Sequence, residues 1–424
     1  MPRPRFRRHR AALAARTIAL LAISAARPAA AETAIQLDGT ANLGYSEVTG
    51  NPSSSQLYTE VRPGLALQFG SPRLVWRTGY VFSGSFTIDG SGPSSYSNAV
   101  DLSLAAQLTS RSTLTLSASA TQGGTAFQLS QRALETSQPG FRAAGNPDLV
   151  SATLTEALGW EAAPAFRVRQ GLAATASAPQ DALDLYSASA IGTLGLDRLF
   201  QEDAIGIELR PSVSVLCAPD GQHYLNTTNA LLGSWNHDFD PSWNGQATAG
   251  VEQVLTFAGS YPLAVVPTGS LTARYLAASG AGTLTYTHGA TTNLQTGTVS
   301  MSDAVVARGI FSFDPVEPRV LGISAGFAHA RPLGQAASQV AAGTGNAVQG
   351  DVRLLWGLGS WVLATATYSA AYQFGQGGGL APSLAQVVLV GITVRYASDR
   401  QTPPVPTLGG RVDGSDAVPF PGSR

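Results

Sequence analysis

Hydrophobic and polar residues alternate with a period of two along most of the chain between Ile35 and Tyr396. One segment places Leu74, Trp76, Tyr80, Phe82, Phe86 and Ile88 in one phase, and Arg73, Arg77, Gly79, Ser83, Ser85 and Thr87 in the other. Successive side chains of a β-strand point to opposite faces of its sheet, so this pattern predicts strands with one apolar and one polar face. No amphipathic helical period interrupts it.

We count about eighteen such segments, and short and long connections alternate between them. The short turns are predicted at Gly70–Pro72, Ser110–Arg111, Ala162–Pro164, Asp240–Ser242, Gly280–Ala281, Pro315–Pro318 and Gly359–Ser360. The longer connections are predicted at Glu47–Ser55, Asp89–Ser95, Gly123–Pro147, Ser260–Pro267, Pro332–Ala347 and Gly375–Ser383. The alternation predicts an all-β fold, a single antiparallel up-and-down β-barrel of about 18 strands, within a range of about 14–18, with two unlike ends.

Several predicted strands exceed the roughly 9–11 residues that a tilted strand needs to cross a bilayer. A sheet can span hydrocarbon only if it closes and pairs every backbone group, so the apolar phase is expected to face lipid and the polar phase to face the interior. A large secreted sandwich or β-helix is the less favoured alternative, because its strands need be neither so long nor so free of charge on one face.

Charged residues fall mainly on the polar phase and give the candidate wall of a lumen. They are Glu60, Arg62, Arg73, Arg77, Asp101, Arg167, Arg169, Glu208, Arg210, Glu252, Arg274, Asp351, Arg353 and Arg395. Nine Arg against five acids predict a mildly anion-attracting interior. Within this set, Glu60 and Arg62, Glu208 and Arg210, and Asp351 and Arg353 are two apart, so each pair shares a face and is placed to form an ion pair.

Two acids depart from the pattern. Glu156 and Asp303 fall on the apolar phase, which indicates a β-bulge, a position near the lipid headgroups or a misassigned register. Aromatic residues, in contrast, cluster where a membrane interface is expected. They flank the short turns as Phe69, Trp160, Phe166, Trp243, Phe313, Trp356 and Trp361, and predict one aromatic girdle.

The N-terminal segment has the parts of a secretory signal. Residues 1–31 hold Arg3, Arg5, Arg7, Arg8, Arg10, Arg16 and Arg27, a short apolar run at 17–23, and Ala29-Ala30-Ala31 before Glu32. All 26 basic residues are Arg, so the chain after cleavage carries 26 − 7 = 19 Arg against 27 acids, a net charge of −8. This balance makes nucleic acid an improbable partner. The single Cys217 is expected to be a buried free thiol.

The last predicted strand ends in Gly391-Ile392-Thr393-Val394-Arg395-Tyr396. Here the chain resembles Gram-negative outer-membrane β-barrels, whose final strand carries a Gly-x-x-apolar-x-aromatic signal for the barrel-assembly machinery. The resemblance implies a barrel over residues 32–396, assembly roles for Gly391, Val394 and Tyr396, and an outer-membrane location in contact with outer-membrane lipids. It departs from the family in Leu389, where a polar residue is usual, and in the Pro- and Gly-rich residues 397–424, predicted to be a periplasmic tail.

Motifs for chemistry are few. Gly322-Ile323-Ser324-Ala325-Gly326 matches the Gly-x-Ser-x-Gly nucleophile motif, but it lies in a predicted strand, and Ser324 and His329 fall on opposite phases. The five His and one Cys show no metal-ligand spacing, so no catalytic residue, metal site or cofactor is predicted.

The function expected from these features is a porin-like channel for small hydrophilic solutes. A close variant is an export barrel that resembles the outer-membrane partners of exopolysaccharide secretion systems, and it predicts aromatic residues along the lumen. The alternative from another class is an outer-membrane hydrolase of lipid or peptide. The connection Gly123–Pro147, with Arg132 and Arg142, is long enough to constrict the lumen.

Overall fold

The computed structural model describes residues 32–49, 53–71, 73–88, 94–123, 149–217, 223–256, 263–292, 299–314, 319–333, 344–359, 361–376 and 382–397. These residues form eighteen β-strands and no α-helix, and none of them belongs to a helix long and apolar enough to cross a membrane. The strands are β1 (Glu32–Thr49), β2 (Ser54–Ser71), β3 (Leu74–Thr87), β4 (Ser95–Thr109), β5 (Ser112–Gly123), β6 (Leu149–Ala163), β7 (Phe166–Pro179), β8 (Ser187–Leu199), β9 (Asp203–Cys217), β10 (His223–Asp240), β11 (Trp243–Thr256), β12 (Ala264–Ala277), β13 (Gly280–Thr292), β14 (Val299–Asp314), β15 (Arg319–Pro332), β16 (Thr344–Gly357), β17 (Val362–Gln376) and β18 (Ser383–Ala397).

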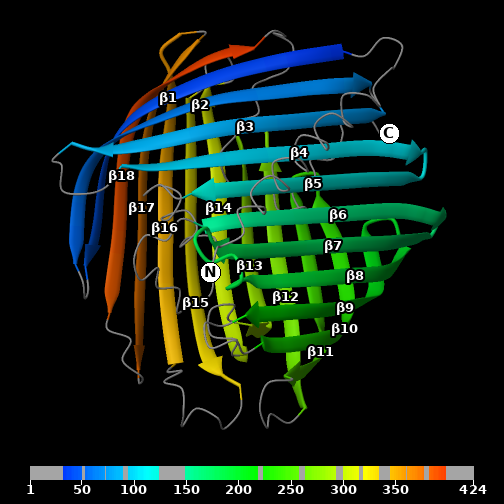
Figure 1. Ribbon diagram of the computed structural model, residues 1–424. Coiled ribbons are helices and arrows are strands. Elements are labelled where there is room, and N and C mark those ends of the chain that lie inside the picture. Colours follow the sequence, from blue (N-terminus) through cyan, green and yellow to red (C-terminus); the bar gives the residue numbers. More distant parts are fainter. Residues whose placement is uncertain are drawn as a thin grey trace, which may run out of the picture.

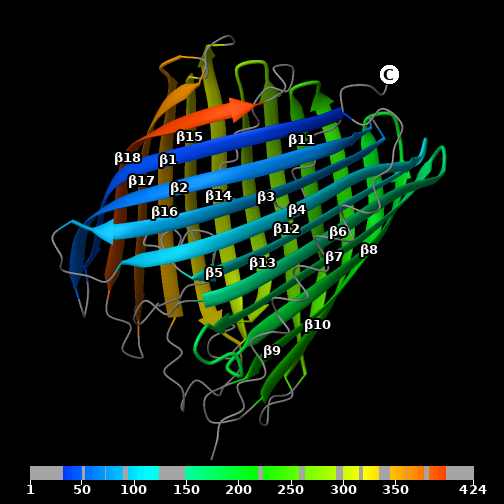
Figure 2. The same cartoon turned by 45° about the horizontal axis from the view of Figure 1, so that its top comes forward.

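The sheet closes on itself. Each strand pairs antiparallel with its neighbour in the chain, and β1 pairs with β18 from Gln36 opposite Ala397 to Thr49 opposite Leu384. The strands form one closed wall in Figures 1 and 2. The prediction of an all-β, eighteen-stranded up-and-down barrel is confirmed, and closure leaves no sheet edge with unpaired backbone groups.

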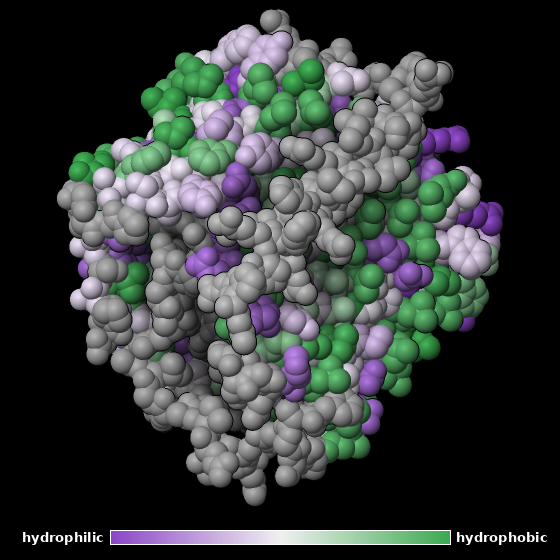
Figure 3. Space-filling view, in the orientation of Figure 1, coloured by the Kyte–Doolittle hydropathy of each residue, from purple (hydrophilic) through white to green (hydrophobic). Residues whose placement is uncertain are grey.

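The two phases of the sequence form the two faces of this wall. The apolar phase lies outside, where large side chains such as Leu43, Ile207 and Val265 are 51%, 61% and 64% exposed. Figure 3 shows hydrophobic residues in broad patches on the outer surface. A protein dissolved in water rarely exposes so much contiguous apolar surface, so this face is suited to contact lipid.

Two kinds of connection depart from the predictions. The turn predicted at Gly280–Ala281 lies two residues earlier, since β12 ends at Ala277 and β13 begins at Gly280. The pattern also missed the connections at 180–186, 200–202, 218–222 and 293–298, between β7 and β8, β8 and β9, β9 and β10, and β13 and β14. The predicted signal at 1–31, the connection between β5 and β6 with Arg132 and Arg142, and the tail after Ala397 lie outside the described residues.

Aromatic side chains gather near the short connections. Phe69 stacks on Trp76, Trp243 lies against Tyr275, and Trp361 lies against Tyr396, with ring centroids 6.4, 4.9 and 5.3 Å apart. Trp160, Phe166, Phe313 and Trp356 are exposed by 41–62% beside other short connections. This arrangement matches the predicted girdle at one rim.

The two acids on the apolar phase both point outward in regular register. Asp303 pairs with His288 on one side and His329 on the other, and Glu156 pairs with Leu116 and Leu172. No register shift occurs at either position. The β-bulge and the register error considered from the sequence are therefore wrong for both acids.

Candidate functional site: the inner wall of the barrel

The register relates the fourteen predicted wall residues to one another around the closed sheet. Thirteen lie within strands, and successive pairings place all of these on the face opposite to the apolar belt. Arg73 lies in the turn between β2 and β3, at the rim. The geometry thus brings these side chains to one surface, while their part in a permeation path stays a prediction.

Five charged residues on this inner face were missed. Glu161 lies opposite Arg167, and Asp238 lies opposite Asn244. Asp38 lies opposite Arg395, Asp197 lies opposite Arg167, and Arg308 lies opposite Ser324. Each falls on the polar phase of its strand, so strict counting of the alternation in β1, β6, β8, β10 and β14 finds them. Among the residues whose side chains the structure describes, the inner face then holds ten Arg and nine acids, an excess of 10 − 9 = +1 in place of the predicted 9 − 5 = +4.

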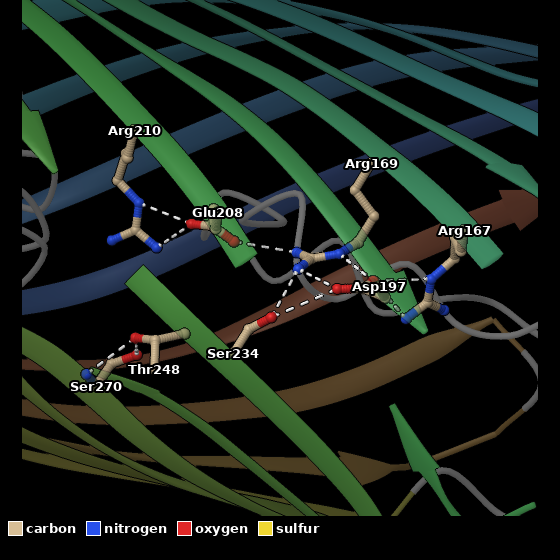
Figure 4. A network of polar contacts seen from close by, with 8 residues as sticks. All are labelled: Arg167, Arg169, Asp197, Glu208, Arg210, Ser234, Thr248 and Ser270. Carbon is tan, nitrogen blue, oxygen red and sulfur yellow. Dashed lines mark hydrogen bonds and ion pairs between the residues drawn. The ribbon is translucent and has the colours of Figure 1, made fainter. Parts of the chain in front are cut away.

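A network of ion pairs crosses β7, β8 and β9 on the inner face, as Figure 4 shows. Asp197 accepts hydrogen bonds from Arg167 at 3.1 Å and from Arg169 at 2.7 and 2.9 Å. Arg169 continues to Glu208 at 3.2 Å, and Glu208 binds Arg210 at 2.6 Å. The predicted pair Glu208 and Arg210 is confirmed, and Asp351 and Arg353 also form an ion pair at 3.3 Å.

The acids and the bases of this network differ sharply in exposure. The side chains of Asp197 and Glu208 are only 3% and 4% exposed, whereas those of Arg167, Arg169 and Arg210 are 35%, 28% and 39% exposed. The carboxylates lie against the wall and the guanidinium groups cover them. A solute that touches this part of the wall therefore meets positive charge and N–H donors.

Glycines on the inner face make this layering possible. A Cβ at Gly206 would contact a carboxylate oxygen of Asp197 and the backbone of Leu196, and one at Gly195 would lie 3.0 Å from a guanidinium nitrogen of Arg169. The missing side chains leave shallow gaps in which the neighbouring strand's charged groups lie flat.

Acids of β1–β4 also lie beside glycines or polar groups of neighbouring strands. The carboxylate of Asp38 lies over Gly64, where a Cβ would be 2.8 Å from its nearest oxygen, and Asp101 lies over Gly79. Glu60, which is fully buried, accepts hydrogen bonds from Asn42 at 3.1 Å and Ser83 at 2.8 Å. Glu60 is the acid of the predicted pair Glu60 and Arg62. The neighbouring strands bind it through the amide of Asn42 and the hydroxyl of Ser83.

Between the charged groups the inner wall carries hydroxyls. Ser and Thr residues of neighbouring strands hydrogen-bond across the sheet, with oxygen separations of 2.6–2.9 Å for most pairs. They include Thr121 with Ser151, Thr175 with Ser189, Ser177 with Ser187, Ser212 with Thr228, and Thr248 with Ser270. Such pairs satisfy one another and still offer lone pairs and a proton to water, so this surface is hydrophilic without being charged.

The nucleophile motif does not assemble a catalytic centre. Ser324 lies on the inner face of β15 and its hydroxyl bonds the carboxylate of Asp351, whereas His329 points outward and bonds Asn346 at 2.8 Å. The opposite orientations predicted from the alternation are those observed. Among the described residues, no group of three or more His, Cys, Asp or Glu side chains is arranged to hold a metal ion.

Aromatic residues are scarce on the inner face. Of the Phe, Trp and Tyr residues in the described strands, only Tyr58 and Tyr224 share the phase of the charged set, and Tyr58 is buried against Val387 and Leu389. The export barrel predicted an aromatic sugar path along the lumen. The described wall does not supply one, so the exopolysaccharide variant lacks support.

Comparisons with known proteins give distant likenesses of the barrel alone. No protein-family model matches the chain, and no curated protein matches it. Among solved structures, OpdO of Pseudomonas aeruginosa is 10% identical with a TM-score of 0.43, over 87% of this chain and 98% of that chain. OccK2 (OpdF) of the same organism, solved in complex with glucuronate, is 12% identical with a TM-score of 0.43, over 85% and 98% of the two chains. The siderophore receptor PirA, also of P. aeruginosa, is 11% identical with a TM-score of 0.41, over 88% and 81%.

Proposed function

We propose that this chain is an outer-membrane channel that lets small hydrophilic solutes cross, with a preference for anions. The observation that carries the proposal is the layering of charge on the inner wall, where carboxylates exposed by 3–4% lie beneath guanidinium groups exposed by 28–39%. A passing ion is attracted by the charges it can approach closely, and these are positive.

The fold supports passage in two ways. Barrels of about 16–18 strands are wide enough to leave an aqueous channel, unlike eight-stranded barrels, whose interiors are filled by side chains. The inner wall is lined by charged groups and hydroxyl pairs, so water and polar solutes find hydrogen-bond partners along it. Export through a cleaved signal at 1–31 and a periplasmic tail after residue 396 belong to the same proposal.

The test is ion conduction by the protein, purified from outer membranes, in planar bilayers. In a tenfold KCl gradient we expect stable current steps and a reversal potential of the sign that chloride preference produces. The preference should persist at 1 M salt, where the Debye length falls to about 3 Å and only charges in near contact with the ion act. A folded barrel that carries no current, or one that prefers potassium, would contradict the proposal.

A further inference from the structure

Glu156 occupies an unusual place on the outer face of the barrel. It lies in the middle of β6, seven residues from each end, and its register partners are Leu116 on β5 and Leu172 on β7. Every other Asp, Glu, Arg or His on the outer phase of the described strands lies within four residues of a strand end. Glu156 is thus the one such group of the described outer wall that sits at mid-height.

The height of Glu156 separates it from the membrane interface. Trp160, on the same strand and phase, belongs to the aromatic girdle, and four residues of a strand tilted by about 40° rise roughly 10 Å. Asp303, the other outward acid of the apolar belt, is bonded by Tyr286 and His288, each at 2.8 Å. Within the described part of the chain Glu156 forms no hydrogen bond or ion pair.

A carboxyl group without a partner is costly in hydrocarbon, whether it is charged or protonated, and such groups mark functional surfaces. The nearest polar side chain on the outer face is Gln170 of β7, which lies opposite Leu158 and so diagonal to Glu156. Gln170 is exposed, and its amide offers both a donor and an acceptor. The two side chains form a small polar patch inside the apolar belt.

The outer surface beside Glu156 and Gln170 carries mostly short side chains. Apart from Leu154 and Val150 of β6, the outer phase of β5–β8 on one side of Glu156 carries mostly alanines: Ala118, Ala120, Ala152, Ala174, Ala176, Ala188 and Ala190. Short side chains let the outer face of a second barrel approach closely. At that distance the side chains of Glu156 and Gln170 can reach hydrogen-bond partners on the second barrel. The alanines make contact feasible, and Glu156 with Gln170 makes it specific.

We propose that the outer face of β5–β8 is the contact between two copies of this chain, with Glu156 of each copy bonded to Gln170 of the other. The patch is self-complementary, because it pairs an acceptor with a donor on adjacent strands. Copies inserted in the same direction present each residue at the same height, so an axis along the membrane normal brings patch against patch. A closed barrel has no edge strand to offer, so side chains must make this contact. The inference rests on membrane insertion of the barrel and is independent of solute passage.

Disulfide cross-linking in intact outer membranes tests the proposal. In a chain carrying Cys217→Ala, the substitution Ala174→Cys places a thiol on the proposed contact, and Leu271→Cys places one on the outer face of β12 as a matched control. We expect oxidation to produce a covalent dimer from Ala174→Cys and none above background from Leu271→Cys. Equal yields from the two positions would overturn the proposal.

Substitution of Glu156 then tests the bond itself. Adding Glu156→Leu should lower the dimer yield from Ala174→Cys about tenfold, the factor for about 1.4 kcal/mol lost from two hydrogen bonds. Glu156→Gln keeps a hydrogen-bonding group and should stay within about twofold of the parent. An unchanged yield with Glu156→Leu would overturn the assignment of Glu156. Heat-modifiable migration in electrophoresis verifies that each variant is folded, and no outcome depends on conduction.

Discussion

Gly206→Ala is the sharpest test of the layered inner wall. Gly206 lies beneath Asp197, and an added Cβ would meet a carboxylate oxygen of Asp197, the carbonyl oxygen of Leu196 and, at 3.0 Å, the Cα of Asp197. Two of these three atoms belong to the backbone of β8, which cannot turn aside as a side chain can. The strands must separate or Asp197 must leave its place, and the ion pairs with Arg167 and Arg169 weaken in either case.

The matched control is Gly322→Ala, also on the inner face. A Cβ there would lie 3.8 Å from the Cβ of Arg353 and 4.0 Å from its carbonyl oxygen, which is ordinary contact. Overpacking costs about 1–3 kcal/mol, whereas replacing an unneeded strand glycine by alanine gains about 0.5–1 kcal/mol. The free energy of unfolding should therefore differ between the two variants by about 1.5–4 kcal/mol, with Gly206→Ala the less stable.

The assay is urea unfolding in lipid vesicles, followed by the fluorescence of the six tryptophans. Reversal potentials in a KCl gradient provide a second measurement, because a displaced Asp197 exposes negative charge to the lumen. We expect Gly206→Ala to shift the potential toward potassium and Gly322→Ala to leave it unchanged. Equal stability and equal potentials for the two variants would refute the reasoning that glycine gaps hold the carboxylates against the wall.

Three further predictions concern the wall and its closure. Arg169→Gln should lower the ratio of chloride to potassium permeability and destabilise the barrel by about 2–4 kcal/mol, since it leaves two buried carboxylates short of donors; adding Asp197→Asn should restore much of that stability in urea unfolding. Thr175→Val should cost about 1 kcal/mol because it strands the hydroxyl of Ser189, whereas Thr175→Val with Ser189→Ala should be close to neutral, and equal costs would argue against the 2.8 Å bond. Tyr396→Ala removes the ring that lies against Trp361 and should slow membrane assembly in pulse-labelled cells, while Tyr372→Ala, near the other end of β17, should assemble at the normal rate.

The alternation of polar and apolar residues predicts most of the fold. A strand buries one face in lipid and turns the other to water, so its two phases must differ in polarity, and a one-residue slip exchanges them. This is why thirteen predicted wall residues fall on one face and why the strand count is right. The shifted turn at 278–279 shows the limit, because Gly280 reads as a turn residue yet opens β13 opposite Phe311.

Partners across the sheet were harder to predict than faces. Register between strands far apart in sequence depends on closure, and only closure brings Asp38 of β1 beside Arg395 of β18. The pairing of Glu60 with Asn42 and Ser83 likewise depends on how three strands align. Which of two groups on one face is buried also has no signature in the alternation, so the sequence predicts charge on the wall but not its layering.

The number of charges on the inner face does not describe the charge that a solute meets, because carboxylates and guanidinium groups differ in exposure. An excess of one Arg on the inner face, taken alone, describes a nearly balanced wall whose field is weak at physiological salt. Because glycines let Asp197 lie flat under the guanidinium groups of β7, the charges that a solute can touch on β7–β9 are mainly positive. A glycine content of 46 residues is therefore more than a means of making turns in this barrel. If the inner wall lines a lumen, as we propose, substitutions at Gly195 and Gly206 should alter selectivity without removing any charged residue.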